Sequence, residues 1–142
     1  MVVASLVFAV AVSASLSADE GSGTEPLMRP TRLSPIRTIT IRQNGAMSSA
    51  GERADQCKAF KLSSKEIHEY IGKAAEVTQK EYFHTLDWSP CYASGKVVFK
   101  NGITGIWGIQ QYRAGLLKLS NGRTLYLYCP RCRAKAFPSA EE

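Results

Sequence analysis

The sequence Cys129-Pro130-Arg131-Cys132 is the clearest candidate for chemistry in this chain of 142 residues. A Cys-Pro-x-Cys pattern is typical of thiol–disulfide exchange sites, in which a lowered thiol pKa makes the first sulfur reactive, and Arg131 and Arg133 favour a thiolate. Those sites place the first cysteine at the start of a helix within a βαβ framework, whereas only ten residues follow Cys132 here. We therefore expect a structural disulfide and keep thiol–disulfide exchange as the alternative function.

Zinc binding has less support in the sequence. A tetrahedral zinc site needs a second pair of ligands, but Cys57 and Cys91 lie 34 residues apart. The dipeptide His68-Glu69 begins like a zinc-protease helix, yet Gly72 stands where the second histidine belongs. We predict neither a metal nor a cofactor.

A hydrolase triad could be drawn from His84, Asp87 and Ser89, but no nucleophile-elbow motif surrounds the serine. The same segment contains three aromatic residues: Tyr82, Phe83 and Trp88. We expect it to be a connector that packs on a sheet, and we assign no catalytic residue.

The elements that position these residues begin with one helix. Ser63 and Glu66 form a capping box, and Leu62 and Ile67 occupy the positions of a hydrophobic staple. Apolar residues continue at helical spacing, so we predict a helix over residues 64–78.

A β-rich block follows the helix. Asn101-Gly102 and Asn121-Gly122 each lie between apolar segments, and Asn-Gly is typical of a two-residue type I′ hairpin turn. Ala114-Gly115 is expected to join the two hairpins. The block therefore predicts a four-stranded antiparallel meander over residues 96–100, 103–112, 116–120 and 123–129.

Two-residue turns fix which side chains share a face of this meander. One face carries Val97, Phe99, Thr104, Ile106, Leu119, Thr124, Tyr126 and Tyr128. The other carries the candidate binding residues Lys96, Lys100, Trp107, Lys118 and Arg123, together with Ile109 and Leu125. We expect the less charged face to contact the helix, which leaves four cations around Trp107 for an acidic partner. A solvated face whose lysines cover Trp107 is the alternative.

The N-terminal residues predict export. Residues 2–16 are uncharged and end in small residues, as in a secretory signal, with cleavage expected at Ala14 or Ala18. No positive n-region precedes them, so we expect the true start codon to lie upstream. The protein is then periplasmic or secreted, with no transmembrane anchor after signal cleavage.

Composition divides the chain into a signal peptide (1–18), a flexible linker (19–56) with one short strand at 36–42, a folded domain (57–133) and a tail (134–142). The linker is rich in Pro, Gly and Ser and is electrically neutral. The whole net charge of +6 therefore belongs to residues 57–142.

An oxidising compartment favours disulfides among Cys57, Cys91, Cys129 and Cys132. Four cysteines allow three pairings, and the sequence alone does not select one. Because a four-stranded meander returns to the end where it began, we prefer Cys91 joined to Cys129 or Cys132, with Cys57 joined to the remaining one.

Residues 86–95 (LDWSPCYASG) and 125–132 (LYLYCPRC) resemble those of a family of short exported bacterial proteins without an assigned activity. The resemblance covers about residues 57–133, and it implies a compartment and a compact fold rather than catalysis.

We thus predict an α+β domain in which one N-terminal helix packs on a four-stranded sheet held by two disulfides. The predicted function is a non-enzymatic binding protein, of the immunity or inhibitor kind. Its partner is expected to be an acidic protein or an anionic envelope polymer, and not a nucleic acid.

Overall fold

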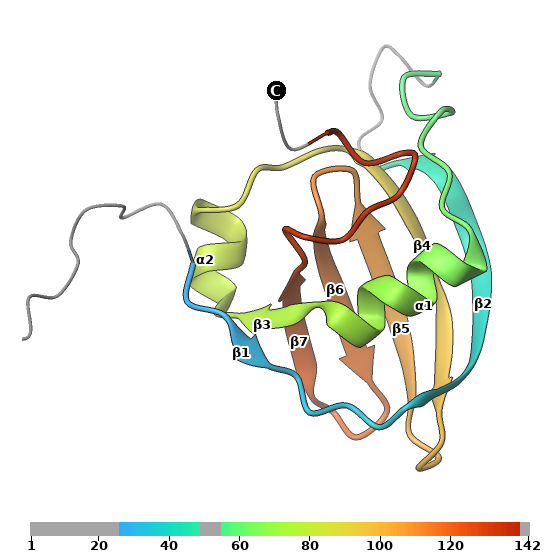
Figure 1. Ribbon diagram of the computed structural model, residues 1–142, viewed down its shortest axis with the longest axis vertical. Coiled ribbons are helices and arrows are strands. Elements are labelled where there is room, and N and C mark those ends of the chain that lie inside the picture. Colours follow the sequence, from blue (N-terminus) through green and yellow to red (C-terminus); the bar gives the residue numbers. More distant parts are fainter. Residues whose placement is uncertain (1–25, 49–54, 140–142) are drawn as a thin grey trace, which may run out of the picture.

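The computed structural model describes residues 26–48 and 55–139 (Figure 1). The expected signal peptide lies outside the described residues. In chain order the described elements are β1 (Arg29–Pro30), β2 (Ile36–Met47), α1 (Ser64–Lys73), β3 (Ala75–Val77), α2 (Gln79–His84), β4 (Cys91–Phe99), β5 (Thr104–Gln110), β6 (Ala114–Leu119) and β7 (Thr124–Tyr128).

The seven strands form one antiparallel sheet in the order β1-β3-β7-β6-β5-β4-β2. The predicted four-stranded meander is present as β4 to β7, but β1 and β3 extend it at one edge and β2 at the other. The fold is therefore mostly β, with two short helices, and the sheet has seven strands rather than the predicted four. The short strand predicted at 36–42 within the linker is present, extends to Met47 and pairs along the length of β4.

The first helix begins where its capping box predicts. The Ser63 hydroxyl accepts the Glu66 N–H, and the Glu66 carboxylate accepts the Ser63 N–H. The helix ends at Lys73 rather than 78, because the chain becomes extended at Ala74 and enters β3. Figure 1 shows α1 lying across one face of the sheet, which we call the inner face; the opposite face is the outer face.

The hairpin turns differ from the predicted type. The Phe99 N–H donates to the Ile103 carbonyl and the Leu119 N–H to the Arg123 carbonyl, so each loop contains three residues (100–102 and 120–122) rather than two. Only the glycines, Gly102 and Gly122, adopt positive φ, both at 89°, whereas a type I′ turn requires positive φ at two successive residues. Both loops are of the three-residue kind, in which a residue in the left-handed region precedes the second strand.

The longer loops change the register of the sheet and therefore its faces. A shift of one residue moves every side chain of a strand to the opposite face. Trp107, Ile109 and Leu125 accordingly lie on the inner face and are buried, whereas Ile106 and Tyr126 lie on the outer face. The predicted face assignment was therefore wrong for β5 and β7. Ala114 and Gly115 also belong to β6, and the connecting loop is 111–113.

The main core fills the space between the inner face and α1. Ile67, Tyr70 and Ile71 of α1 are buried there, and the C-terminal segment crosses the same side (Figure 1). Phe137 packs against Phe60 and Tyr70, with ring centroids 6.1 and 6.4 Å apart. The segment from 134 to 139 therefore contributes to the core rather than extending from it as a tail.

The disulfides join Cys57 to Cys91 and Cys129 to Cys132. The preferred pairing of Cys91 with Cys129 or Cys132 was wrong. Both ends of the meander do lie at the same end of the sheet, but β7 is three strand spacings, about 14 Å, from β4. A disulfide needs Cα atoms within about 7 Å. The extension of β2 to Met47 brings in the partner instead, because Met47 faces Cys91 and the chain then returns through Cys57.

Candidate functional site

Two of the predicted binding residues lie together on the outer face. Lys96 in β4 faces Ile106 in β5, and Ile106 faces Lys118 in β6. The two lysine side chains thus flank Ile106, with their backbones about 10 Å apart. Both lysines are exposed, and Ile106 is 54% exposed although it is a large apolar residue. We call Lys96, Ile106 and Lys118 the basic row.

The basic row borders a shallow hollow with a volume of about 440 Å³. Residues 88–140 include eight Lys and Arg but no Asp or Glu, so strands β4 to β7 bring no carboxylate to either face. Two cations without an anionic neighbour on their own strands create a positive potential that attracts acidic groups.

The other predicted members of the binding face are elsewhere. Trp107 is 1% exposed and lies in the core, where its indole N–H donates to the Lys96 carbonyl at 2.9 Å. Lys100 is exposed in the β4–β5 loop, beyond the end of the row. Arg123, directly before β7, is engaged in an ion pair with Glu76, at 3.2 Å.

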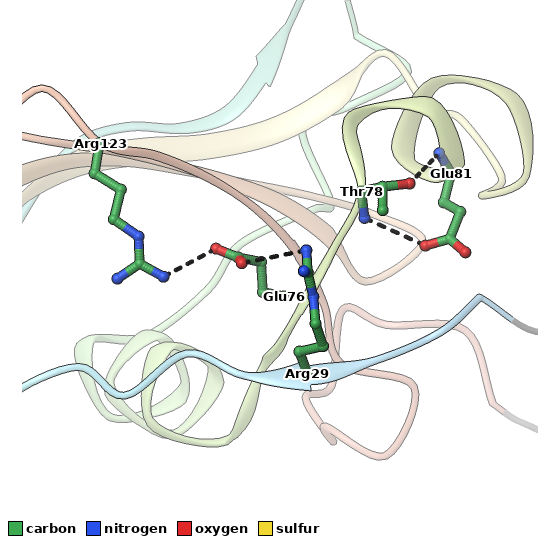
Figure 2. A network of polar contacts seen from close by, with 5 residues as sticks. All are labelled: Arg29, Glu76, Thr78, Glu81 and Arg123. Carbon is green, nitrogen blue, oxygen red and sulfur yellow. Dashed lines mark hydrogen bonds and ion pairs between the residues drawn. The ribbon is translucent and has the colours of Figure 1, made fainter.

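Figure 2 shows this ion pair within a small network at the β1–β3 edge. Glu76 lies between Arg123 and Arg29, whose guanidinium is 3.5 Å from the second carboxylate oxygen. Glu81 caps α2 by accepting the Thr78 N–H at 3.2 Å, and the Thr78 hydroxyl accepts the Glu81 N–H. These carboxylates are therefore structural, and Arg123 is not a free cation.

The backbone N–H of Leu27 also donates to Glu81, at 3.1 Å. This bond, followed by those from Thr78, holds the pKa of the Glu81 carboxyl below its ordinary value of 4.5, although partial desolvation opposes the shift. The charged form of Glu81 thus ties the segment before β1 to the start of α2.

A groove lined by aromatic side chains adjoins the basic row on the outer face. Tyr82, Trp88 and Tyr92 line it, and Gly108 and Leu116 lie at its base, enclosing a volume of about 230 Å³. Gly108 and Leu116 each lie two residues along the strand from a member of the basic row, a separation of about 7 Å. We call this feature the aromatic groove.

The helix α2 forms one side of the groove. Its residues Tyr82 and Phe83 pack on Tyr126, with ring centroids 5.2 and 5.8 Å apart. Burial, and then the nearby Tyr126, raises the pKa of the Tyr82 hydroxyl from 10.0, so this wall is uncharged at neutral pH. The expectation that the connector packs on the sheet holds for Tyr82 and for the face of Phe83 that contacts Tyr126, although Phe83 is 62% exposed overall and Trp88 is 67% exposed.

The loop that carries Trp88 is fixed on both sides of the indole. The Gln110 side-chain amide donates to the Asp87 carbonyl at 3.0 Å. The Ser89 hydroxyl donates to Gln111 at 2.9 Å and accepts the Cys91 N–H at 3.1 Å. These bonds hold the loop on either side of Trp88 before any partner arrives, which lowers the entropy cost of ordering the loop on binding.

The same contacts decide the arrangement of the proposed triad. Ser89 is 4% exposed, and its hydroxyl is committed to Gln111 and Cys91 rather than to a histidine. His84 and Asp87 are exposed. Among residues 26–48 and 55–139, moreover, no three His, Cys, Asp or Glu side chains cluster in a way that would hold a metal ion.

The Cys129–Cys132 disulfide closes a turn directly after β7, in which the Cys132 N–H donates to the Cys129 carbonyl at 3.2 Å. The two residues are 4% and 5% exposed, and no helix begins after them within the described residues. This geometry lacks the exposed sulfur and helix N-terminus that activate a redox cysteine.

No protein-family model, curated protein or solved structure matches the chain. The two disulfides are consistent with an oxidising, extracytoplasmic location. Among the described residues, no helix has the length and apolar character needed to cross a membrane.

Lys96 and Lys118 share one face, as predicted, and their role in binding stays a prediction, whereas the aromatic groove was not predicted. A usable signal was present in Thr78-x-x-Glu81, a capping-box pattern that marks the start of α2. Recognition of α2 would have placed Tyr82 and Phe83 on a helix beside the sheet. Whether Gly108 and Leu116 lie at the groove depends on the strand register, and the predicted two-residue turns placed β5 in the wrong register.

Proposed function

We propose that this protein is an exported, non-enzymatic binding module and that its outer face binds an acidic protein, as in an immunity or inhibitor protein. The observation that carries the proposal is the basic row, in which Lys96 and Lys118 flank the exposed Ile106 on strands devoid of carboxylates. Charge complementarity of this kind steers association and selects partners of opposite charge.

The composition of the surface favours a protein over an anionic envelope polymer. Polymer binding suits a continuous track of cations, whereas here an apolar side chain separates two lysines and an aromatic groove lies beside them. An apolar and aromatic centre with charges around it is typical of protein–protein interfaces. Export rests on the apolar N-terminal sequence and on the disulfides.

The test compares two charge-reversed variants that change the net charge equally. Lys96→Glu/Lys118→Glu reverses the basic row, and Lys58→Glu/Lys65→Glu reverses two exposed lysines, one before α1 and one in its first turn. Each immobilised protein is incubated with envelope extract at low and at high salt, and captured material is identified by mass spectrometry. We expect the parent and the Lys58/Lys65 variant to retain one acidic protein stoichiometrically, and the Lys96/Lys118 variant to retain about tenfold less at low salt.

Equal capture by both variants would contradict the proposal. Retention of a protease-resistant anionic polymer in place of a protein would also contradict it, and would assign the face to an envelope component.

A further inference from the structure

The aromatic groove carries an inference that rests on the proposed function and specifies its partner further. We propose that the partner's binding segment presents one aromatic side chain, which enters this groove, with a carboxylate two residues away that reaches the basic row.

The groove has room for such a side chain because Gly108 lies at its base. A Cβ atom at Gly108 would meet nothing closer than the Ala93 carbonyl, at 4.0 Å. The open volume of about 230 Å³ therefore extends down to the backbone of β5 between the rings of Tyr82, Trp88 and Tyr92. Flat, fixed aromatic rings around a small floor form a receptacle for a planar apolar group.

The polar groups around the groove favour an apolar anchor over a sugar. The Tyr92 hydroxyl contacts Gln43 at 3.1 Å, and the Ser89 hydroxyl is bonded to Gln111 and Cys91. Gln110 bonds to the Asp87 carbonyl through its amide and to the Tyr112 N–H through its oxygen. A saccharide site needs several polar groups free to receive its hydroxyls, whereas the side chains of Ser89, Tyr92 and Gln110 already have partners within the fold, which leaves the hydroxyls of Ser48 and Tyr82 at the groove.

The position of the basic row sets the spacing of the partner's charge. Leu116 at the groove and Lys118 in the row are two residues apart on β6, about 7 Å. Alternate side chains of an extended peptide have the same separation. A segment with an aromatic residue at one position and an acidic residue two positions away therefore satisfies both features at once.

The experiment uses defined peptides and the disulfide-bonded protein labelled with ¹⁵N. The probe is acetyl-Glu-Asp-Phe-Asp-Glu-amide, and the matched peptides replace Phe by Ala or all four acids by Lys. The chain has two tryptophans, of which Trp88 is 67% exposed at the groove and Trp107 is 1% exposed in the core. Their indole N–H signals thus report separately on the groove and on the integrity of the fold.

We expect the Phe peptide to shift the Trp88 indole signal in a saturable manner while the Trp107 signal stays in place. The Ala peptide should bind about tenfold more weakly, and the Lys peptide should not bind at low salt. Two variants test the groove itself by fluorescence polarisation of a labelled Phe peptide. Gly108→Val fills the base and Trp88→Ala removes a wall, and each should weaken binding about tenfold. Thr124→Val, an exposed change on the same face outside the groove, should not.

Equal affinities for the Phe and Ala peptides would overturn the proposed aromatic anchor. If the Lys96/Lys118 variant nevertheless fails to capture the acidic protein, the proposed function stands without the anchor. Saturable shifts of Trp88 by chitotriose, with none by the peptides, would also overturn the inference and assign the groove to a glycan. Conversely, peptide binding through Phe that is unaffected by Lys96→Glu/Lys118→Glu would support the groove but contradict the acidic partner.

Discussion

At Arg113 the backbone adopts a φ of 73°, in the left-handed region that non-glycine residues rarely occupy. The contacts of its side chain account for an arginine at this position. Its guanidinium donates to the carbonyls of Cys132 and Pro138 and lies 5.1 Å from the centre of the Phe137 ring. Arg113 therefore fastens the C-terminal segment to the β5–β6 loop.

Substitutions of Arg113 separate the cost of the strained backbone from the stabilisation by the side-chain contacts. Arg113→Gly relieves about 1 kcal/mol of backbone strain but removes two charge-assisted hydrogen bonds, for a net loss of about 2 kcal/mol in the free energy of unfolding. Arg113→Ala keeps the strain and should lose about 1 kcal/mol more. Urea unfolding followed by Trp107 fluorescence measures both, and a glycine variant as stable as the parent would show that the side-chain contacts contribute little.

Glu81 supplies a pH dependence confined to one edge of the molecule. Its folded-state pKa lies below 4.5, so its contribution to stability is complete above that pH and is lost as the pH falls through the lower folded value. We expect the Leu27 amide signal in a ¹⁵N spectrum to move toward its unfolded position only in that acidic range. In Glu81→Ala the signal should already be displaced at pH 7. An unchanged Leu27 amide in the variant would contradict the contact.

Among the elements, the hairpin loops are stabilised by glycine, whereas the helix α1 is destabilised by it. Gly102→Ala or Gly122→Ala places a Cβ at a φ of 89° and should each cost about 1 kcal/mol of unfolding free energy. Gly72→Ala in α1, where no atom lies within 4 Å of the added Cβ, should instead stabilise by about 0.5–1 kcal/mol. Thermal unfolding of the three variants provides the comparison, and a neutral Gly102→Ala would contradict the loop type.

The elements also show which features local sequence could predict. The start of α1 was predictable because Ser63 and Glu66 bond to each other three residues apart. The two β-hairpins were predictable from Asn-Gly, but their register was not, because Asn-Gly also fits a three-residue loop with only the glycine at positive φ. The one additional residue in the loop places Trp107 in the core and Ile106 on the surface, the reverse of the predicted arrangement.

The cysteine pairing depended on a non-local event that the sequence did not disclose. The alternating Ile residues of 36–42 predicted a short strand, but not that it extends to Met47 and pairs with β4, which brings Cys57 to Cys91. A strand at a sheet edge gains its stability from the partner strand rather than from its own composition. Lys96 and Lys118 do share the face on which they were predicted together, and their role in binding stays a prediction.

On the scale of the whole molecule, the two disulfides should contribute unequally. Cys57–Cys91 joins residues 34 apart and Cys129–Cys132 joins residues 3 apart. Loop-closure entropy predicts a loss of about 4 kcal/mol for Cys57→Ala/Cys91→Ala and about 2 kcal/mol for Cys129→Ala/Cys132→Ala. Urea unfolding of the two double variants measures the difference. A larger loss from the second pair, or a peptide map linking Cys91 to Cys132, would contradict the arrangement.

The most direct test of the outer face as the binding surface is a lysine footprint of the complex captured from envelope extract. Acetylation with a succinimidyl ester, read by mass spectrometry with and without the partner, compares every exposed lysine in one experiment. The account predicts that Lys96 and Lys118 become protected while Lys58 and Lys65 react as in the free protein. Protection of Lys58 and Lys65 with Lys96 and Lys118 still reactive would place the partner elsewhere and contradict it.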